Sequence, residues 1–469
     1  MKKLLGIIVL GLLWCNISFA DDEHLHDFNQ WLYQSGNHQY LNLEQKEVCK
    51  KLIQQHGLKV PKVGLVDEPK YKSMEWFSNK CHKFQATNNL KIKKNKKRNN
   101  LGSGSNPNID TLIYYLWNYS YRQRSSMDVR TAGVELKPTK KPYEFKFNLI
   151  EDKFVKKQMK TKGILSYLYY QDGQVLIDET SPKERLGKFM NDETKYYSMS
   201  MSKSLVSYII GHAICDGYID GVDARINDWS ILNNSLYYNQ KLIDLLNMSA
   251  GDQKYISEFK KGTKDAEYEN ESIYRTINVV FKDSIKSKSI YNYNGFVTQL
   301  ILNYTKYKTG DDYDKLLNKI FIDKVKIKHS ILFSILANSY EKNGNRHPNI
   351  SASRYDWLRI AKAIMDDYQN DTCVGKYLKE IYKRRIPKGS KEKEEPLFNR
   401  TKSYGGQFHM DFPGLKDKII FGMGGYGGNV ILIDVENSRI LVLNSLHYNN
   451  KKYKYNHKKL ILDPFKKGK

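Results

Sequence analysis

The chain has 469 residues, 40% of them hydrophobic, which is ample for a packed core and excludes a wholly disordered protein. Its net charge of +26 invites a nucleic-acid interpretation, but the basic residues are spread along the chain and no nucleic-acid-binding module is recognisable. We therefore expect a solvated basic surface and no nucleic-acid partner. Attraction to an anionic envelope polymer is the alternative explanation of the charge.

The first twenty residues have the pattern of a cleaved export signal. Lys2 and Lys3 precede an apolar run from Leu4 to Trp14, and small residues end at Ala20. The run is too short to span a bilayer comfortably. We expect cleavage after residue 20, a periplasmic or secreted mature protein, and no transmembrane span after that cleavage. An uncleaved anchor is the alternative.

Composition divides the remaining chain into three parts. Residues 21–90 are predicted to form a small helical N-terminal region, because apolar residues recur there at helical spacing. Residues 91–108 combine a basic run with Gly, Ser, Asn and Pro, which is typical of a linker. Residues 109–469 are predicted to form one large domain.

Four cysteines follow the signal, and none forms a C-x-x-C pair, so neither a zinc site nor any other metal site is predicted. An oxidising compartment would permit a disulfide between Cys49 and Cys81. Cys215 lies on the apolar side of a predicted helix, so we expect it to be a buried free thiol.

Predicted strands lie at both ends of the large domain, with predicted helices between them. Asp172 and Gly173 join two β-prone runs, which is typical of a hairpin. Apolar residues recur at helical spacing from Met201 to Ile214. Further helices are expected at residues 240–248 and 353–368, and further strands at residues 418–422, 429–434 and 439–444. This order predicts an α+β architecture in which the terminal strands share one sheet.

The principal candidate for chemistry is the S-x-x-K pattern formed by Ser200 and Lys203. This spacing puts a hydroxyl at the start of a helix and an amine one turn further along the same face. Ser257, Ser339 and Ser390 begin the same pattern, but only Ser200 leads into a long apolar-periodic helix. The alternative for Ser200 is a helix N-cap beside an ordinary surface lysine.

The sequence from Ser200 to Trp229 resembles the nucleophile region of the β-lactamase-related serine hydrolases, with S-x-x-K, a long helix and a D-G-x-[IL] segment. Residues 241–251 are similar to that family's LL-x-x-[ST]-[SA]-G segment. The family includes class C β-lactamases, D-alanyl-D-alanine carboxypeptidases, family VIII esterases and nylon-oligomer (aminohexanoate) hydrolases. The resemblance covers roughly residues 163–444. It implies a serine-β-lactamase-like fold, an antiparallel sheet flanked by helices plus an all-helical lobe, with Ser200 acylated and Lys203 activating it.

The family's second motif carries a tyrosine that moves protons between the nucleophile and the leaving group. The resemblance points to Tyr293 in this role, with Tyr291 as the alternative. A phenol becomes a better acid when a cation such as Lys203 lies nearby. The family usually has Asn or Ser two residues after this tyrosine, where this chain has Gly295.

The family's third motif, Lys or His followed by any residue and Gly, corresponds here to Met423, Gly424 and Gly425. The resemblance implies a substrate-binding role for Gly425 and an oxyanion hole formed by the backbone N–H groups of Ser200 and Tyr426. The motif's cation, which normally meets a substrate carboxylate, is missing. Its absence favours a neutral ester or amide.

The resemblance as a whole implies a secreted serine hydrolase that cleaves a small ester or amide through a Ser200 acyl-enzyme and uses no cofactor. A D-alanyl-D-alanine carboxypeptidase or a β-lactamase acting on cell-wall-type substrates is the first alternative. The second is a non-catalytic homologue whose basic surface binds an envelope polymer.

Overall fold

The computed structural model describes residues 134–466, apart from residues 186, 188–189, 261–272, 337–344, 390–397 and 446–453. The expected signal, the helical N-terminal region, the linker and the first residues of the large domain lie outside the described residues. So do Cys49 and Cys81, and the predicted disulfide between them therefore stays a prediction.

A nine-stranded sheet forms the centre of the domain, in the order β10-β11-β12-β13-β14-β15-β3-β4-β2. Its strands are β2 (Lys146–Phe147), β3 (Ile164–Gln171), β4 (Gln174–Thr180), β10 (Ile386–Pro387), β11 (Ser403–Gly405), β12 (Phe408–Met410), β13 (Ile420–Gly425), β14 (Asn429–Asp434) and β15 (Arg439–Ser445). Neighbouring strands pair antiparallel except β2 and β4, which pair parallel. Because β15 pairs with β3, the strand-rich regions from the two ends of the domain share one sheet, as predicted.

The hairpin between β3 and β4 turns at the predicted dipeptide. Asp172 and Gly173 have φ angles of 48° and 89°, both in the left-handed region. A two-residue hairpin loop with positive φ at both positions matches the twist of the flanking strands, and Asp-Gly adopts that conformation readily. The local sequence therefore sets the pairing of these two strands.

A second sheet of four strands lies beside the helices and has the order β1-β8-β9-β5. Its strands are β1 (Val134–Leu136), β5 (Lys195–Tyr197), β8 (Ile331–Leu336) and β9 (Asn345–Ser353), while β6 (Arg225–Ile226) and β7 (Gln240–Lys241) form a separate pair. Strand β5 leads directly toward Ser200, so this small sheet anchors the chain just before the candidate nucleophile.

The described helices are α5 (Lys153–Thr161), α6 (Met201–Cys215), α7 (Leu242–Leu246), α8 (Gln253–Lys260), α9 (Ile273–Thr276), α10 (Gly295–Thr309), α11 (Tyr313–Asn318), α12 (Arg354–Gln369), α13 (Cys373–Lys383) and α14 (Asp463–Lys466). Helices α6 and α12 match their predicted ranges to within a residue or two. The helix predicted over residues 240–248 is shorter, because residues 240–241 pair with β6 as a strand.

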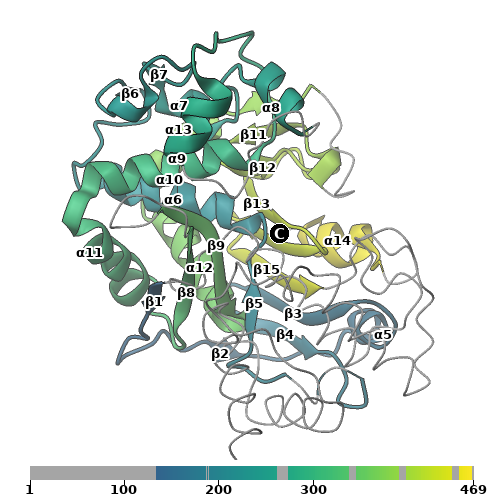
Figure 1. Cartoon of the computed structure of the whole chain (residues 1–469). Coiled ribbons are helices and arrows are strands. Elements are labelled where there is room, and N and C mark those ends of the chain that lie inside the picture. The colour runs from purple at the N-terminus through teal and green to yellow at the C-terminus, as the bar shows by residue number, and fades with distance from the viewer. Residues whose placement is uncertain are drawn as a thin grey trace, which may run out of the picture.

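The large sheet is buried on both faces. Alternate residues of β3 divide between two cores: Leu168 and Tyr170 pack with α12, and Tyr167 and Tyr169 pack with α5 and the C-terminal helical segment. Figure 1 shows α6, α7, α10 and α13 gathered in the upper part of the view, higher than β3 and β4 at the other end of the sheet. A strand with both faces covered carries a continuous apolar run, and residues 164–170 of β3 are all buried accordingly.

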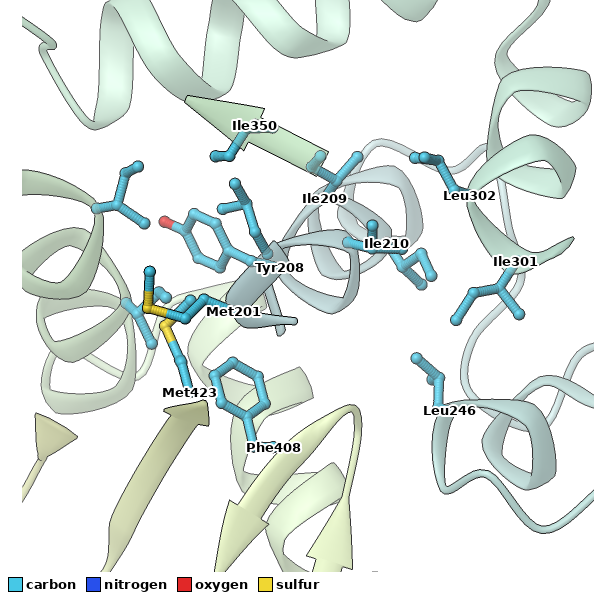
Figure 2. Close-up of a cluster of buried hydrophobic side chains, with 14 of the residues drawn as sticks. Met201, Tyr208, Ile209, Ile210, Leu246, Ile301, Leu302, Ile350, Phe408 and Met423 are labelled. Carbon is cyan, nitrogen blue, oxygen red and sulfur yellow. The ribbon is translucent and has the colours of Figure 1, made fainter. Parts of the chain in front are cut away.

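Helix α6 lies inside the domain rather than on its surface. Its residues Met201, Tyr208, Ile209 and Ile210 are fully buried, and Figure 2 shows these side chains extending to several sides of the helix. A helix that is apolar all round must be covered on every side. The candidate nucleophile therefore sits at the end of a helix held rigidly by the core.

Cys215 is not a free thiol, contrary to the prediction, but forms a disulfide with Cys373. Cys215 is the last residue of α6, and Cys373 is the first residue of α13, which packs against α6. Periodicity placed Cys215 on the side of α6 that packs against the core, although the residue is half-buried and not buried as predicted. A pattern within one helix carries no information about a partner 158 residues away. The disulfide joins the far end of the nucleophile helix to its neighbour.

We predict that replacing both Cys215 and Cys373 with Ala lowers the free energy of unfolding by about 2–4 kcal/mol, because a long loop of the unfolded chain is no longer closed. Urea unfolding without a reductant measures the difference between the double variant and the wild type. Dithiothreitol should lower the wild-type stability by a similar amount. Equal unfolding midpoints of the two proteins without reductant would contradict the disulfide.

Candidate active site

The chain makes a strained turn between β5 and α6, immediately before Ser200. Met199 has a φ of 49°, in the left-handed region that residues other than glycine rarely enter. Ser202 Oγ donates a 2.8 Å hydrogen bond to the carbonyl oxygen of Met199 and holds the turn from within the helix. Strained backbone of this kind persists only where the surroundings impose it, and it clusters at functional sites. The turn brings Ser200 to the first position before α6.

Ser200 occupies the N-cap position of α6, but its side chain makes no capping hydrogen bond. Its Oγ instead accepts a 3.2 Å hydrogen bond from Nζ of Lys203, one turn further along the helix. Both side chains are half-buried, so the amine is neither a freely solvated surface group nor sealed in the core. The geometry fits a serine with an adjacent amine base better than a simple helix cap.

Tyr293 lies beside this pair. Its ring centroid is 5.1 Å from Nζ of Lys203, and its side chain is half-buried. Tyr291, the alternative, is buried and packs against Tyr404, with ring centroids 5.1 Å apart. Of the two tyrosines, Tyr293 is the one whose ring lies beside Lys203.

The third segment of the site is the end of β13. A Cβ atom added at Gly425 would lie 2.7 Å from the carbonyl oxygen of Ser198, well inside normal contact distance. Glycine is therefore required where this strand passes the turn before the nucleophile. Tyr426 follows at the strand end and is half-buried. The structure thus brings Ser200, Lys203, Tyr293, Gly425 and Tyr426 into one region from three distant parts of the chain.

Met423, at the position of the missing cation, does not face the site. Its side chain is fully buried in the main core. Figure 2 shows Met423 near Met201 and Phe408, under the start of α6. The position therefore contributes packing beneath the nucleophile helix and supplies no charge.

A buried Lys–His pair lies one strand away and was missed by the sequence analysis. His409 of β12 is paired with Gly422 of β13, and its ring lies 6.1 Å from that of Tyr293. Lys388 is 3% exposed, and its Nζ donates to the carbonyl oxygen of Phe398, to Thr401 Oγ1 and to Nδ1 of His409. With Lys388 as the donor of this bond, Nδ1 accepts and the ring proton is assigned to Nε2.

His409 is a neutral group in this setting. Burial above all, and then the positive charges of Lys388 and Lys203, hold the pKa of His409 well below its usual range. No pattern around either residue in the sequence signals their pairing, because residues 388 and 409 meet only through the β10–β11–β12 strand pairings.

Gln407 connects the elements that carry the site. This buried residue has a φ of 65°, and its backbone oxygen accepts from Ser204 Oγ of α6 at 2.7 Å. Its side-chain Oε1 accepts from Thr298 Oγ1 of α10 at 2.7 Å, and its Nε2 donates to the carbonyl oxygen of Leu246 of α7 at 3.0 Å. The helix bearing Ser200 and the helix that follows Tyr293 are thus joined through the backbone and the side chain of one residue.

The described residues contain no group of three or more His, Cys, Asp or Glu side chains arranged to hold a metal ion. Among the helices of the described part, none is long and apolar enough to cross a membrane.

No family model matches the sequence, and no curated protein matches it. Solved structures do. A protein described as a 6-aminohexanoate-dimer hydrolase from Bacillus anthracis is 13% identical with a TM-score of 0.51, over 70% of this chain and 89% of that chain. A penicillin-binding protein from Bacillus halodurans is 12% identical, with a TM-score of 0.45, over 63% of this chain and 95% of that one. A protein described as a β-lactamase from Bacteroides dorei is 13% identical, with a TM-score of 0.47, over 63% and 89%.

At such low identity, the first of these likenesses establishes the fold alone. It agrees with the arrangement found here, a mainly antiparallel sheet covered by helices with a helical lobe above one end. The predicted fold class is confirmed, and so is the resemblance stated from the sequence, at the level of the fold. The chain has the fold of the β-lactamase-related serine hydrolases.

Proposed function

We propose that this protein is a serine hydrolase that cleaves a neutral ester or amide through an acyl-enzyme at Ser200. The observation that carries the proposal is the hydrogen bond between Lys203 Nζ and Ser200 Oγ, 3.2 Å long, at a strained turn. The ring of Tyr293, 5.1 Å from the same amine, supports it. A hydroxyl beside an amine base, with a second proton-transfer group in reach, is the arrangement that acyl transfer requires.

Acylation follows from these positions. Lys203, in its uncharged form, takes the proton of Ser200 Oγ as the oxygen attacks the substrate carbonyl carbon. The tetrahedral oxyanion accepts hydrogen bonds from the backbone N–H groups of Ser200 and Tyr426, and the N-terminal end of α6 stabilises its charge. Tyr293 delivers a proton to the leaving oxygen or nitrogen, and the bond to the acyl carbon breaks.

Deacylation reverses the proton transfers with water as the nucleophile. Water loses a proton to the Lys203 and Tyr293 pair and attacks the acyl carbon. Ser200 Oγ leaves and recovers its proton. Each proton given up in one half of the cycle is returned in the other, so the cycle needs no cofactor.

The surroundings of the site support a neutral substrate. Met423 is buried in the core, and the nearby Lys388 amine already donates to three protein acceptors. His409 is neutral because its pKa is depressed by burial and by the neighbouring lysines. Neither Lys388 nor His409 is therefore suited to receive the carboxylate of a β-lactam or a D-Ala-D-Ala peptide. A carboxypeptidase or a β-lactamase would need a cation other than Lys388 or His409 to bind the substrate carboxylate. A non-catalytic envelope-binding protein would leave the Ser200–Lys203 hydrogen bond without a catalytic role.

Export is part of the proposal. The disulfide between Cys215 and Cys373 supports it, because disulfides persist in oxidising compartments and are rare in the cytosol of most cells. The sequence pattern of residues 1–20 favours the same location.

We predict that a fluorescent fluorophosphonate labels the native protein and that Ser200→Ala abolishes the labelling, because only an activated serine attacks the phosphorus of the probe, forming a P–O bond and releasing fluoride. Ser257→Ala is the matched control: it begins another S-x-x-K pattern, on exposed α8, and should label like the wild type. A folded wild-type protein that stays unlabelled contradicts the hydrolase proposal. Salt-sensitive binding to an anionic polymer would then favour the envelope-binding alternative, and labelling by a fluorescent penicillin would favour the peptidase or β-lactamase.

We predict that Tyr293→Phe lowers kcat for 4-nitrophenyl butyrate about 100-fold or more, because the phenol no longer transfers a proton to or from the reacting atoms. Tyr291→Phe should leave kcat within about threefold of the wild type, since that ring packs against Tyr404. Steady-state kinetics on the two variants give the comparison. The reverse order of effects would assign the catalytic role to Tyr291.

A further inference from the structure

Tyr293 lies in neither a helix nor a strand. It belongs to residues 284–294, an irregular segment that ends where α10 begins at Gly295. An irregular segment has no ladder of backbone hydrogen bonds to hold a side chain in place, so its conformation depends on the groups that anchor it. The residues on either side of Tyr293 are both asparagine, and both reach the same carboxylate.

That carboxylate is Asp252. Its Oδ1 accepts from Nδ2 of Asn292 at 3.0 Å, and its Oδ2 accepts from Nδ2 of Asn294 at 3.3 Å. Asp252 follows Gly251 in the segment between α7 and α8 and is fully buried. The two amides that flank Tyr293 thus both bind one buried carboxylate.

The anchoring extends into α10 on one side and to α7 on the other. Asn294 Oδ1 accepts from the backbone N–H of Val297 at 3.0 Å, so the amide bonded to Asp252 also caps the helix. The backbone N–H of Asn292 donates to the carbonyl oxygen of Met248 at 2.8 Å. Asp252 therefore lies at the centre of the contacts that fix both ends of the tyrosine segment.

The chemistry of these contacts is unusual for a purely structural carboxylate. The third side-chain donor to Asp252 is the hydroxyl of Tyr237, at 2.8 Å. These three donors are two amides and a phenol, none of them a cation, and burial raises the pKa of the Asp252 carboxyl. Among the residues that the structure describes, no cation bonds to this carboxylate. A carboxylate buried in that state is costly, and apolar packing of equal volume would often be at least as stable. Its contribution to specific geometry therefore explains the arrangement better than stability does.

We propose that Asp252 is a positioning residue that holds the phenol of Tyr293 beside Lys203 by binding the amides of Asn292 and Asn294. The inference rests on the proposed function, in which Tyr293 transfers protons around Ser200. Asp252 does not touch the reacting atoms. It acts through the segment, so its loss displaces Tyr293 while the Ser200–Lys203 hydrogen bond stays in place.

Asp252→Asn tests the assignment with minimal change in volume. The new amide has one oxygen and one NH2 group, so one of the two flanking asparagines faces a donor instead of an acceptor. We expect kcat for 4-nitrophenyl butyrate to fall about 100-fold with little change in KM, because a reacting group displaced by about 1 Å costs that much. The limb of the pH profile of kcat that depends on Tyr293 should shift, which a loss of stability alone would not produce.

Asn294→Asp in the same chain is the rescue. In the Asp252→Asn/Asn294→Asp double variant, the amide at position 252 donates to a carboxylate at position 294, which restores that bond with its roles exchanged. The 3.0 Å bond from Nδ2 of Asn294 to the carbonyl oxygen of Asn292 is lost, so the rescue is expected to be partial. An aspartate at position 294 still caps α10, since Asp and Asn are equally good N-caps. We expect the double variant to recover kcat by about tenfold over Asp252→Asn.

Asp356→Asn is the matched control. Asp356 is equally buried and accepts from Ser353 Oγ and Arg359, but it lies at the start of α12 and not beside Tyr293. The Asp356→Asn variant should have a lower unfolding midpoint but the same kcat and pH profile as the wild type.

Fluorophosphonate labelling of the wild type distinguishes a failure of the proposed function from a failure of the role of Asp252. An unlabelled wild type contradicts the proposed function, whereas a labelled wild type with unchanged kcat and pH profile in Asp252→Asn overturns the role of Asp252 alone. If Asp252→Asn does not fold, the double variant is measured instead. Esterase activity in a folded double variant supports the role of Asp252, and a folded but inactive double variant overturns that role.

Discussion

The backbone of β13 passes so close to the turn before α6 that no side chain fits between them. A Cβ atom at Gly425 would lie 2.7 Å from the carbonyl oxygen of Ser198, and Met199 in the same turn has a φ of 49°. The position of Ser200 relative to the sheet depends on this approach. The core beneath it, with Met201 and Met423, gives the turn no room to relax (Figure 2).

Buried polar groups then relate the other parts of the site to this turn. Gln407 joins α6 to α10 and α7, and Asp252 joins the segment of Tyr293 to the chain after α7. Such groups are costly to bury unless every hydrogen bond is made, so they tolerate few alternative arrangements. The apolar core supplies stability, and these two residues supply the relative orientation of helices that the core alone would leave adjustable.

The charged side chains near the site also differ in burial and in their hydrogen-bond partners. Lys203 is half-buried beside Ser200, whereas Lys388 is almost fully buried and donates to three protein acceptors. The two lysines thus have different contacts, because one donates to the hydroxyl of Ser200 and the other bonds to groups around the β10–β12 corner. Burial and the neighbouring lysines hold the pKa of His409 well below its usual range, so its ring carries no charge.

The sequence by itself determined the features that depend on local pattern: the Asp172–Gly173 hairpin, the helix from Met201, the strand over residues 429–434, and the S-x-x-K spacing of Ser200 and Lys203. Each of these is set by residues within a few positions of one another, where periodicity and turn chemistry act. Only the tertiary structure decided the partner of Cys215, the pairing of Lys388 with His409, the choice of Tyr293 over Tyr291 beside Lys203, and the anchoring by Gln407 and Asp252. These contacts join residues that are distant in the chain, and their partners are chosen by how helices and strands pack, which local pattern does not encode.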